Sequence, residues 1–158
     1  MEKNKISIIT VVKNSSKTIE KTIQSLLSQK YKNLEYLVID GNSTDGTLEI
    51  LNKYRENISL LISEEDKGIW DAMNKGVSLA KGDIIGFLNS DDTYFENSLN
   101  IVNNYFSNNK IDFLFGSVEK YKLMHGFKPW KIKWSFGFYT SHSVGFFIKR
   151  QSHIEVGS

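Results

Sequence analysis

The hydrophobic positions of the chain follow two periods in turn, one typical of buried strands and one of amphipathic helices. Residues Ile6–Val12 form a run rich in β-branched and apolar side chains, which predicts a buried strand. The next apolar positions recur at helical spacing and predict one apolar helix face, made by Ile19, Ile23, Leu26 and Leu27. This part of the chain therefore predicts a strand followed by a helix that packs against it.

The same alternation continues along the rest of the chain. Further strands are predicted at residues 36–39, 58–62, 84–88, 112–118 and 144–148. Further helices are predicted at residues 44–54, 69–80 and 97–106. Strands that alternate with helices imply right-handed crossovers and a mostly parallel sheet. The predicted fold class is therefore α/β, a central sheet flanked by helices.

The helix predicted at residues 69–80 has an inward face formed by Ile69, Met73, Val77 and Ala80. Gly82 follows shortly afterwards and is well placed to end this helix, as glycine often does. The whole segment is therefore expected to lie with one face on the sheet.

The strand predicted at residues 84–88 is followed closely by two adjacent carboxylates, Asp91 and Asp92. In α/β sheets, ligands bind beyond the carboxyl ends of the strands, and two neighbouring carboxylates are costly unless a cation or hydrogen-bond donors lie nearby. A hard divalent ion that also binds a phosphate would satisfy the pair. The alternative is that the two aspartates cap the next helix. This stretch alone leaves both interpretations open.

Polar residues follow three other predicted strands: Lys13 and Asn14 after the first, Asp40 after the second, and residues 64–67 after the third. In a parallel sheet these strand ends share one edge with Asp91 and Asp92. Acidic groups at several strand ends are difficult to explain as helix caps alone. The clustering therefore favours a metal and phosphate site.

Composition limits the alternatives for the chain of 158 residues, which suits one domain over residues 1–158. A net charge of +2 gives no argument for nucleic acid, and the absence of cysteine excludes disulfides and thiolate metal sites. No run approaches the ~18 apolar residues of a membrane span, so a cytoplasmic location is expected. No glycine-rich loop follows Val12, so neither the dinucleotide-binding fingerprint nor the P-loop is present. No Gly-x-Ser-x-Gly elbow is present, which argues against a hydrolase of that type.

Residues 119–141 combine five lysines with seven aromatic side chains, and they allow two interpretations. The functional one is a mobile flap, an acceptor surface or a patch for peripheral membrane association. The structural one is a β-excursion with its lysines outside and its aromatics packed on the core. The second is favoured because exposed aromatic surface is the less common case.

Five motifs, in this order and spacing, resemble those of inverting family 2 glycosyltransferases with the GT-A fold. They are SIITVVKN at residues 7–14, IDGNSTDGT at 39–47, DKGIWDAMNKG at 66–76, FLNSDD at 87–92, and the segment 141–150. The resemblance covers residues 6–157. It implies that a sugar is moved from a nucleotide-sugar donor, most commonly a UDP-sugar, to a saccharide or lipid-linked acceptor. It also implies bacterial surface polysaccharide synthesis, in the cytoplasm or at the inner face of the membrane.

The resemblance also implies roles for single residues. Those expected to bind the nucleotide are Thr10, Val12, Asn14, Asp40, Asp66, Gly68, Asp71 and Asp91. Among them, Asp40 would accept a hydrogen bond from the base, and the turn from Gly68 to Asp71 would close over the nucleoside. Asp92 would coordinate Mg²⁺ or Mn²⁺, with the motif usually written Asp-x-Asp appearing here as Asn89-Ser90-Asp91-Asp92. His142 matches a histidine near the diphosphate and acceptor, although a structural histidine is equally compatible.

The expected reaction is a direct displacement at the anomeric carbon, with a carboxylate base that deprotonates the acceptor. Here the sequence departs from the family, because the base normally follows the His142 motif and the only later carboxylate is Glu155. By its place in the pattern, Glu155 precedes the base. The base is therefore expected beyond Ser158 in a chain truncated at its C-terminus. The alternative function is nucleotide-sugar binding without turnover, and apolar surface left uncovered would favour a homodimer.

Overall fold

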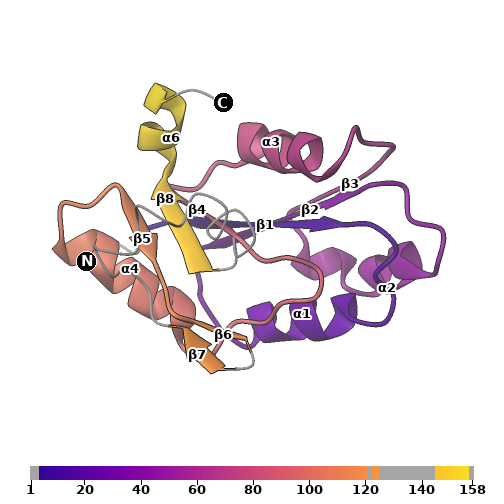
Figure 1. The fold of residues 1–158 in the computed structure, drawn as a ribbon, viewed down its shortest axis with the longest axis horizontal. Coiled ribbons are helices and arrows are strands. Elements are labelled where there is room, and N and C mark those ends of the chain that lie inside the picture. Colours follow the sequence, from indigo (N-terminus) through magenta and orange to yellow (C-terminus); the bar gives the residue numbers. More distant parts are fainter. Residues whose placement is uncertain (1–3, 121, 125–144, 157–158) are drawn as a thin grey trace.

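A six-stranded sheet runs through the centre of the molecule, with helices on both of its faces (Figure 1). The computed structural model describes residues 4–120, 122–124 and 145–156. The strands lie in the order β3-β2-β1-β4-β8-β5. Their bounds are β1 Ile6–Val12, β2 Leu34–Asp40, β3 Leu60–Ser63, β4 Ile84–Phe87, β5 Phe113–Phe115 and β8 Phe146–Lys149.

The first four strands are parallel and form the part of the sheet that the sequence predicts most directly. In their register Val12 pairs with Asp40, and Asp40 pairs with Ser63, so the polar strand ends come level with one another. The prediction of an α/β fold with a mostly parallel sheet is confirmed. The shared carboxyl edge is the place where any site built from these loops must lie.

Strand β8 lies between β4 and β5 and is antiparallel to both. The predicted strand at residues 112–118 is therefore corrected to the three residues of β5, which pair with β8 and not with β4. Gly86 explains why β8 fits beside β4, since a Cβ there would lie 2.5 Å from Cε1 of Phe147. A small second sheet follows β5, formed by β6 Val118–Lys120 and β7 Lys122–Met124.

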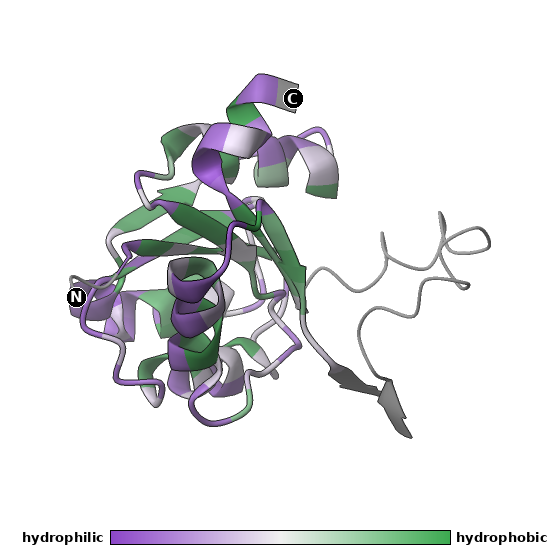
Figure 2. Cartoon of the chain, turned by 90° about the vertical axis from the view of Figure 1, so that its left-hand side faces the viewer, coloured by the Kyte–Doolittle hydropathy of each residue, from purple (hydrophilic) through white to green (hydrophobic). Residues whose placement is uncertain are grey.

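Helices cover the two faces of the sheet unequally. One face carries α1 Ile19–Leu27, α2 Thr47–Lys53 and α4 Ser98–Asn108, and the other carries α3 Ile69–Leu79 (Figure 1). A 3₁₀ turn, Arg55–Asn57, leads into β3, and α6 Arg150–Val156 follows β8. Apolar strands lie between helices whose outer faces are polar, as Figure 2 shows. Among the described residues, none of the helices has the length and apolar character needed to cross a membrane.

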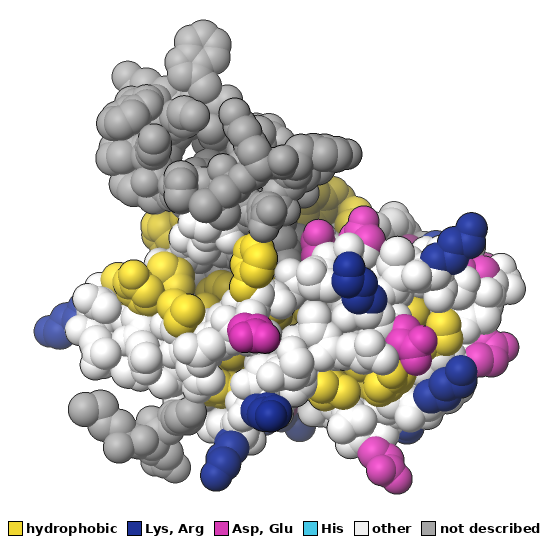
Figure 3. All heavy atoms as spheres, turned by 90° about the horizontal axis from the view of Figure 1, so that it is seen from below, with side chains coloured by type: hydrophobic (Ala, Val, Ile, Leu, Met, Phe, Trp, Pro, Cys, Tyr) yellow, Lys and Arg dark blue, Asp and Glu magenta, His cyan; other side chains and the backbone are white. Residues whose placement is uncertain are grey.

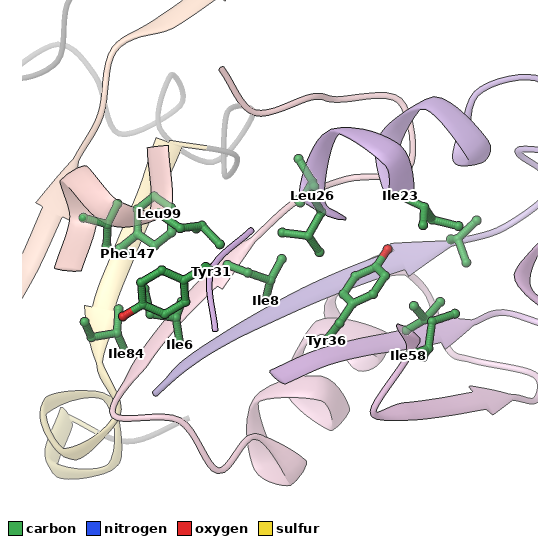
Figure 4. Close-up of a cluster of buried hydrophobic side chains, with 14 of the residues drawn as sticks. Ile6, Ile8, Ile23, Leu26, Tyr31, Tyr36, Ile58, Ile84, Leu99 and Phe147 are labelled. Atoms are coloured by element: carbon green, nitrogen blue, oxygen red, sulfur yellow. The ribbon is translucent and has the colours of Figure 1, made fainter. Parts of the chain in front are cut away.

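The larger core lies between the sheet and α1, α2 and α4. Figure 4 shows how Ile8 and Tyr36 of the strands meet Ile23 and Leu26 of α1. These helix positions are fully buried, as their spacing predicts. The core fixes α1 relative to β1 and β4, so it also fixes the start of α1 near the carboxyl edge.

The smaller core lies under α3, which approaches the sheet closely at Gly76. A Cβ on Gly76 would lie 2.5 Å from Cγ2 of Ile9, so only glycine fits at this depth. Ile69 does not take its predicted place in this core. It is 55% exposed, because α3 buries residues against the sheet only from Ala72 onward.

Gly82 does not end α3, which stops at Leu79 with Ala80 as its C-terminal cap. Gly82 instead lies against β1, where its amide donates to Oγ of Ser7 at 2.8 Å and a Cβ would lie 2.6 Å from the Ser7 nitrogen. The glycine is therefore required by close packing and not by the end of a helix.

Candidate functional site

The loops that follow β1, β2, β3 and β4 meet at the carboxyl edge of the sheet and are joined by hydrogen bonds. The hydroxyl groups of Ser15 and Ser90 lie 3.0 Å apart and connect the loops after β1 and β4. Asn14 has a positive φ of 51°, and its Oδ1 accepts a hydrogen bond from the Thr44 amide at 2.9 Å. Asn14 therefore connects the loops after β1 and β2, as an exposed residue on the edge.

A neighbouring contact holds the same two loops. The Asp45 carboxylate accepts from the amide of Ser16 at 3.0 Å and from the amide and hydroxyl of Thr47. These donors, the Thr47 hydroxyl foremost, hold the pKa of Asp45 well below its usual range. Asp45 therefore stays ionised and fixes the start of α2 against the loop after β1.

Asp40 lies at the end of β2 and is fully buried. Its carboxylate accepts hydrogen bonds from the amide and hydroxyl of Ser43 and from the hydroxyl of Ser63 at 2.6 Å. These donors give both buried oxygens of Asp40 a hydrogen-bond partner, as burial of a polar group requires. Asp40 therefore joins the ends of β2 and β3 directly beneath the site.

Gly41 brings a second carboxylate over this position. A Cβ on Gly41 would collide with the carboxylate of Asp66 and lie 3.2 Å from Cδ of Lys13. Asp66 and the stem of Lys13 therefore pack over Gly41, next to buried Asp40. The sequence places Lys13 at this edge but does not predict that Gly41 lies beneath it, and only the packing shows this contact.

Asp66, Gly68 and Asp71 form one compact turn at the start of α3. Oδ1 of Asp66 accepts from the Gly68 amide at 2.9 Å, and Oδ2 of Asp71 accepts from the Lys67 amide at 3.2 Å. Gly68 has a φ of 116°, which side chains rarely adopt. The turn is therefore held by its own hydrogen bonds, and both carboxylates belong to its frame.

The negative charge of this region also acts on Lys75 of α3. Lys75 forms an ion pair with Glu64, and that hydrogen bond is the main reason why the pKa of Lys75 is raised. The charges of Asp71 and Asp66 raise the pKa further. Lys75 therefore stays protonated and offsets part of the carboxylate repulsion at this edge.

Asp91 and Asp92 lie in a turn that follows β4. The Asp92 amide donates to the Asn89 carbonyl at 3.1 Å, and Oδ2 of Asp92 accepts from the Asn89 side-chain amide at 3.0 Å. The hydroxyl of Thr22, on α1, donates to the Asp92 carbonyl at 2.8 Å. The interpretation of this pair as a helix cap is wrong, because α4 begins only at Ser98 and its N-cap is Asn97.

Tyr94 packs beneath the Asp92 turn. Its hydroxyl donates to the Phe87 carbonyl at 2.9 Å, and its ring stacks on Phe147 of β8 with 5.9 Å between the ring centres. Burial and then the charge of Asp92 raise the pKa of Tyr94 far above its usual value. Tyr94 therefore remains a neutral donor that joins the turn to the sheet.

Two predicted nucleotide-binding residues lie below the edge and not on it. Thr10 is fully buried; its hydroxyl donates to the Leu88 carbonyl at 2.7 Å and lies 3.1 Å from the hydroxyl of Tyr36. Burial raises the pKa of Tyr36 to about 12, so Tyr36 stays protonated. Val12 is 4% exposed and belongs to the larger core. Both residues support the loops, and their contact with a ligand stays a prediction.

His142 and most of residues 119–141 lie outside the described residues, so both predictions about them stay predictions. Glu155 is exposed on α6. That helix starts at the amino end of β4, where the Arg150 amide donates to the Asp83 carbonyl at 2.9 Å. Asp91 and Asp92 follow the opposite end of β4. The helix that carries Glu155 therefore starts at the other edge of the sheet, away from the two aspartates.

Comparison with known proteins now adds to this geometry. The family model described as glycosyl transferase family 2 matches residues 7–156. The chain belongs to glycosyl transferase family 2.

Two relatives from Escherichia coli are named UDP-Glc:alpha-D-GlcNAc-diphosphoundecaprenol beta-1,3-glucosyltransferases. WfaP is 35% identical over 118 residues, which is 73% of this chain and 47% of WfaP. WfgD is 37% identical over 115 residues, which is 72% of this chain and 46% of WfgD. The chain thus spans about half the length of these relatives.

Solved structures share the fold. TarS of S. aureus, residues 1–349, superposes with a TM-score of 0.74 at 23% identity, over 92% of this chain and 47% of that one. A mannosyltransferase from Pyrobaculum calidifontis, solved with GDP-Man and Mn²⁺, gives a TM-score of 0.75 at 20% identity, over 99% of this chain and 48% of that one. The fold of this family 2 domain is therefore the GT-A fold.

The Asp91–Asp92 turn fits one of the two ways in which proteins bind divalent metals. Within the described part of the chain, there is no group of three or more His, Asp or Glu side chains that could form a closed metal cage. Mg²⁺ is usually held by one or two carboxylates together with substrate phosphates. Two adjacent carboxylates on an open turn match that second arrangement.

A cleft of about 750 Å³ opens beside the same turn, and no local pattern of side chains predicts it. Asp91 and Asp92 form one end, α4 forms one wall, and β5 with the residues after it forms the other. Figure 3 shows apolar side chains on the face of this family 2 domain that carries α4. Pairing of β5 with β8, which the local pattern could not predict, creates this cleft.

Proposed function

We propose that this family 2 domain is the nucleotide-sugar-binding part of an inverting, metal-dependent glycosyltransferase that uses a UDP-sugar. The observation that carries the proposal is the Asp91–Asp92 turn, which lies on the same edge as the Asp66–Asp71 turn and buried Asp40. The Asp91–Asp92 turn suits a metal-bound diphosphate, and the Asp66–Asp71 turn and Asp40 suit a nucleoside. The names of the two Escherichia coli relatives, which include UDP-Glc, support UDP as the carrier.

At the metal end, Asp92 would bind Mg²⁺ or Mn²⁺, and Asp91 would contact the ribose or the ligands of the metal. The metal, when bound, stabilises the charge that develops on the leaving diphosphate. The chain's own contribution is to hold the turn in place, through the Thr22 hydroxyl and the Asn89 amide. A turn fixed in this way avoids reorganisation when the donor binds.

At the nucleoside end, the turn from Asp66 to Asp71 would close over the base and ribose. Asp40 would accept a hydrogen bond from the base. Its two oxygens already accept hydrogen bonds from Ser43 and Ser63, so a base would have to displace one of these hydroxyls. Asn14 would complete this wall from the loop after β1.

The acceptor would be a saccharide or a lipid-linked saccharide in bacterial surface polysaccharide synthesis. The support comes from the Escherichia coli relatives, whose names give a diphosphoundecaprenol-linked acceptor. Such an acceptor would bring the protein to the inner face of the membrane. His142 would lie near the diphosphate and the acceptor.

The second candidate function is binding of the nucleotide-sugar without transfer. It is favoured because the chain aligns with only 46 to 47% of the length of the two relatives, so residues that act in their other half have no counterpart among the aligned positions. The general base would be one such residue.

Two measurements separate these functions. Calorimetry with UDP in the presence of Mn²⁺, and again with a chelator, tests donor binding, and we expect affinity only with the metal. Release of UDP from a panel of UDP-sugars, with saccharide acceptors added, tests transfer. Metal-dependent binding with release above background supports the transferase. Binding without release supports the second function, and no binding of UDP in the presence of Mn²⁺ contradicts both.

A further inference from the structure

The cleft beside the Asp91–Asp92 turn changes in polarity from one end to the other. At the turn it is lined by Asp91, Asp92, Thr93 and Glu96. Away from the turn it is lined by Ile101 and Tyr105 of α4 and by Leu114 and Phe115 of β5. Its floor is the stacked pair Tyr94 and Phe147. A ligand that matches this cleft therefore has a polar, hydroxyl-rich end and an apolar end.

The apolar end exposes large apolar side chains on a face of α4 that does not pack on the sheet. Ile101 is 47% exposed and Tyr105 is 50% exposed, and they lie one turn apart on α4. Phe95 at the mouth of the cleft is 57% exposed. The face of α4 that packs on the sheet is a different one, made by Leu99, Val102, Asn103 and Phe106. A rimmed apolar surface of this kind is typical of a binding site.

Resting on the proposed function, we infer that this cleft binds a lipid-linked saccharide acceptor, with the sugar at the Asp91–Glu96 end and the first part of the polyprenyl chain along Ile101, Tyr105 and Phe115. The cleft is continuous with the candidate metal site, because Asp91 and Asp92 belong to both. A sugar held at that end would therefore face the donor. The volume of about 750 Å³ lies in the range of small-molecule sites.

The chemistry of the two ends supports this orientation. The Glu96 carboxylate can accept hydrogen bonds from sugar hydroxyls, and the hydroxyl groups of Thr93 and Ser98 can both accept and donate them. Aromatic rings such as that of Phe95 offer flat apolar area to the faces of a sugar. An acyl or prenyl chain gains free energy for each methylene group that it buries, and the Ile101 to Phe115 end is apolar enough to provide that gain.

The experiment compares two acceptor probes with the complete chain of 158 residues. One probe is α-N-acetylglucosaminyl diphosphate that carries an alkyl chain of roughly eleven carbons, which replaces about two isoprene units of a polyprenyl chain. The other probe is the same compound without the alkyl chain. Affinity is measured by calorimetry below the micelle concentration. For the unaltered protein we expect the alkyl chain to tighten binding by roughly tenfold or more.

The test variant is Ile101→Ser combined with Tyr105→Ser, and the control is Leu79→Ser, a 38% exposed apolar residue on α3 that does not line the cleft. The test variant should lose the gain from the alkyl chain, whereas the control should keep it. UDP affinity with Mn²⁺ is measured on every variant, so that failure of donor binding is distinguished from failure of the cleft. Circular dichroism confirms that each variant is folded.

Three outcomes would overturn the inference. The first is that the alkyl chain gives no gain with the unaltered protein, and the second is that the gain persists in the Ile101→Ser, Tyr105→Ser variant. The third uses vesicles of anionic phospholipid without acceptor. If these bind the unaltered protein but not the variant, and the probes do not compete, the surface contacts membrane lipid and is not an acceptor site.

Discussion

Single residues set the site through two kinds of contact, direct binding and close approach. Asp92 is the residue expected to bind the metal, and it is held by Thr22 and Asn89. Gly41 has no side chain with which to bind a ligand, but its lack of a Cβ allows Asp66 to lie over the end of β2. A change at Asp92 is therefore expected to alter the affinity for UDP with metal, and a change at Gly41 is expected mainly to alter packing.

Replacement of Asp92 by asparagine should weaken metal-dependent UDP binding. The change keeps the shape of the side chain but removes the charge that attracts a hard cation, so we expect affinity with Mn²⁺ to fall by about tenfold or more. Calorimetry with and without Mn²⁺ measures the effect. Glu56→Gln, at an exposed residue of the 3₁₀ turn, is the control. Unchanged affinity of the Asp92 variant would refute its role in metal binding.

Replacement of Gly41 by alanine should destabilise the protein by about 1–3 kcal/mol, because the new Cβ displaces the Asp66 carboxylate and crowds Lys13. Urea unfolding measures the change. If the collision is the cause, the double variant Gly41→Ala, Asp66→Ala should be less destabilised than the sum of the two single changes. Additive effects would mean that the two residues do not interact.

At the scale of elements, α3 shows how one helix carries part of the site. Its N-cap is Gly68 and its first turn contains Asp71, while its middle packs on the sheet through Gly76 against Ile9. The depth at which α3 packs therefore determines where the Asp66–Asp71 turn lies. The exposed first turn, with Ile69 55% and Trp70 60% exposed, extends beyond the packed part.

Replacement of Gly76 by alanine should cost about 1–3 kcal/mol of unfolding free energy, because Ile9 lies in a close-packed core and cannot move aside freely. It should also lower UDP affinity by shifting the Asp66–Asp71 turn. Asn74→Ala, on the exposed face of the same helix, should change stability by no more than about 0.5 kcal/mol. Equal effects of the two changes would show that α3 is not closely packed at Gly76.

At the scale of the whole molecule, the opposite edge of the sheet is held by a buried carboxylate. Glu35 of β2 is 8% exposed and accepts from Lys5, from the Ser7 hydroxyl and from the Lys81 amide. Burial raises the pKa of Glu35, but these three donors together lower it by more, so the pKa lies below its ordinary 4.5. Glu35 thereby joins β1, β2 and the connection from α3 to β4.

This contact predicts a pH dependence of global stability. Because the pKa of Glu35 is lowered on folding, its contribution is fully present above pH 4.5 and is lost as the pH falls through the folded value. Urea unfolding between pH 7 and pH 3 should therefore show a smaller loss of stability for Glu35→Gln than for the unaltered protein. Glu56→Gln should keep the full loss. An identical pH profile for the two variants would contradict the assignment.

The strands β1 to β4, the helices between them and the acidic carboxyl edge could be predicted from the sequence, because each depends on side chains within a few positions of one another. A continuous apolar run identifies β1, helical spacing identifies α1, Asp40 ends β2, and Asp91 follows shortly after β4. Parallel strands then bring their ends together by geometry alone. The family motifs add the roles of these residues as predictions.

Only the tertiary structure decided the remaining features, because they depend on contacts between distant segments. Insertion of β8 between β4 and β5 joins Gly86 to Phe147, and no local pattern selects that pairing. The burial of Thr10, the placing of Asp66 over Gly41 and the cleft along α4 follow from the same kind of long-range packing. Local periodicity determines which segments become strands and helices, and packing of distant side chains determines which of them meet.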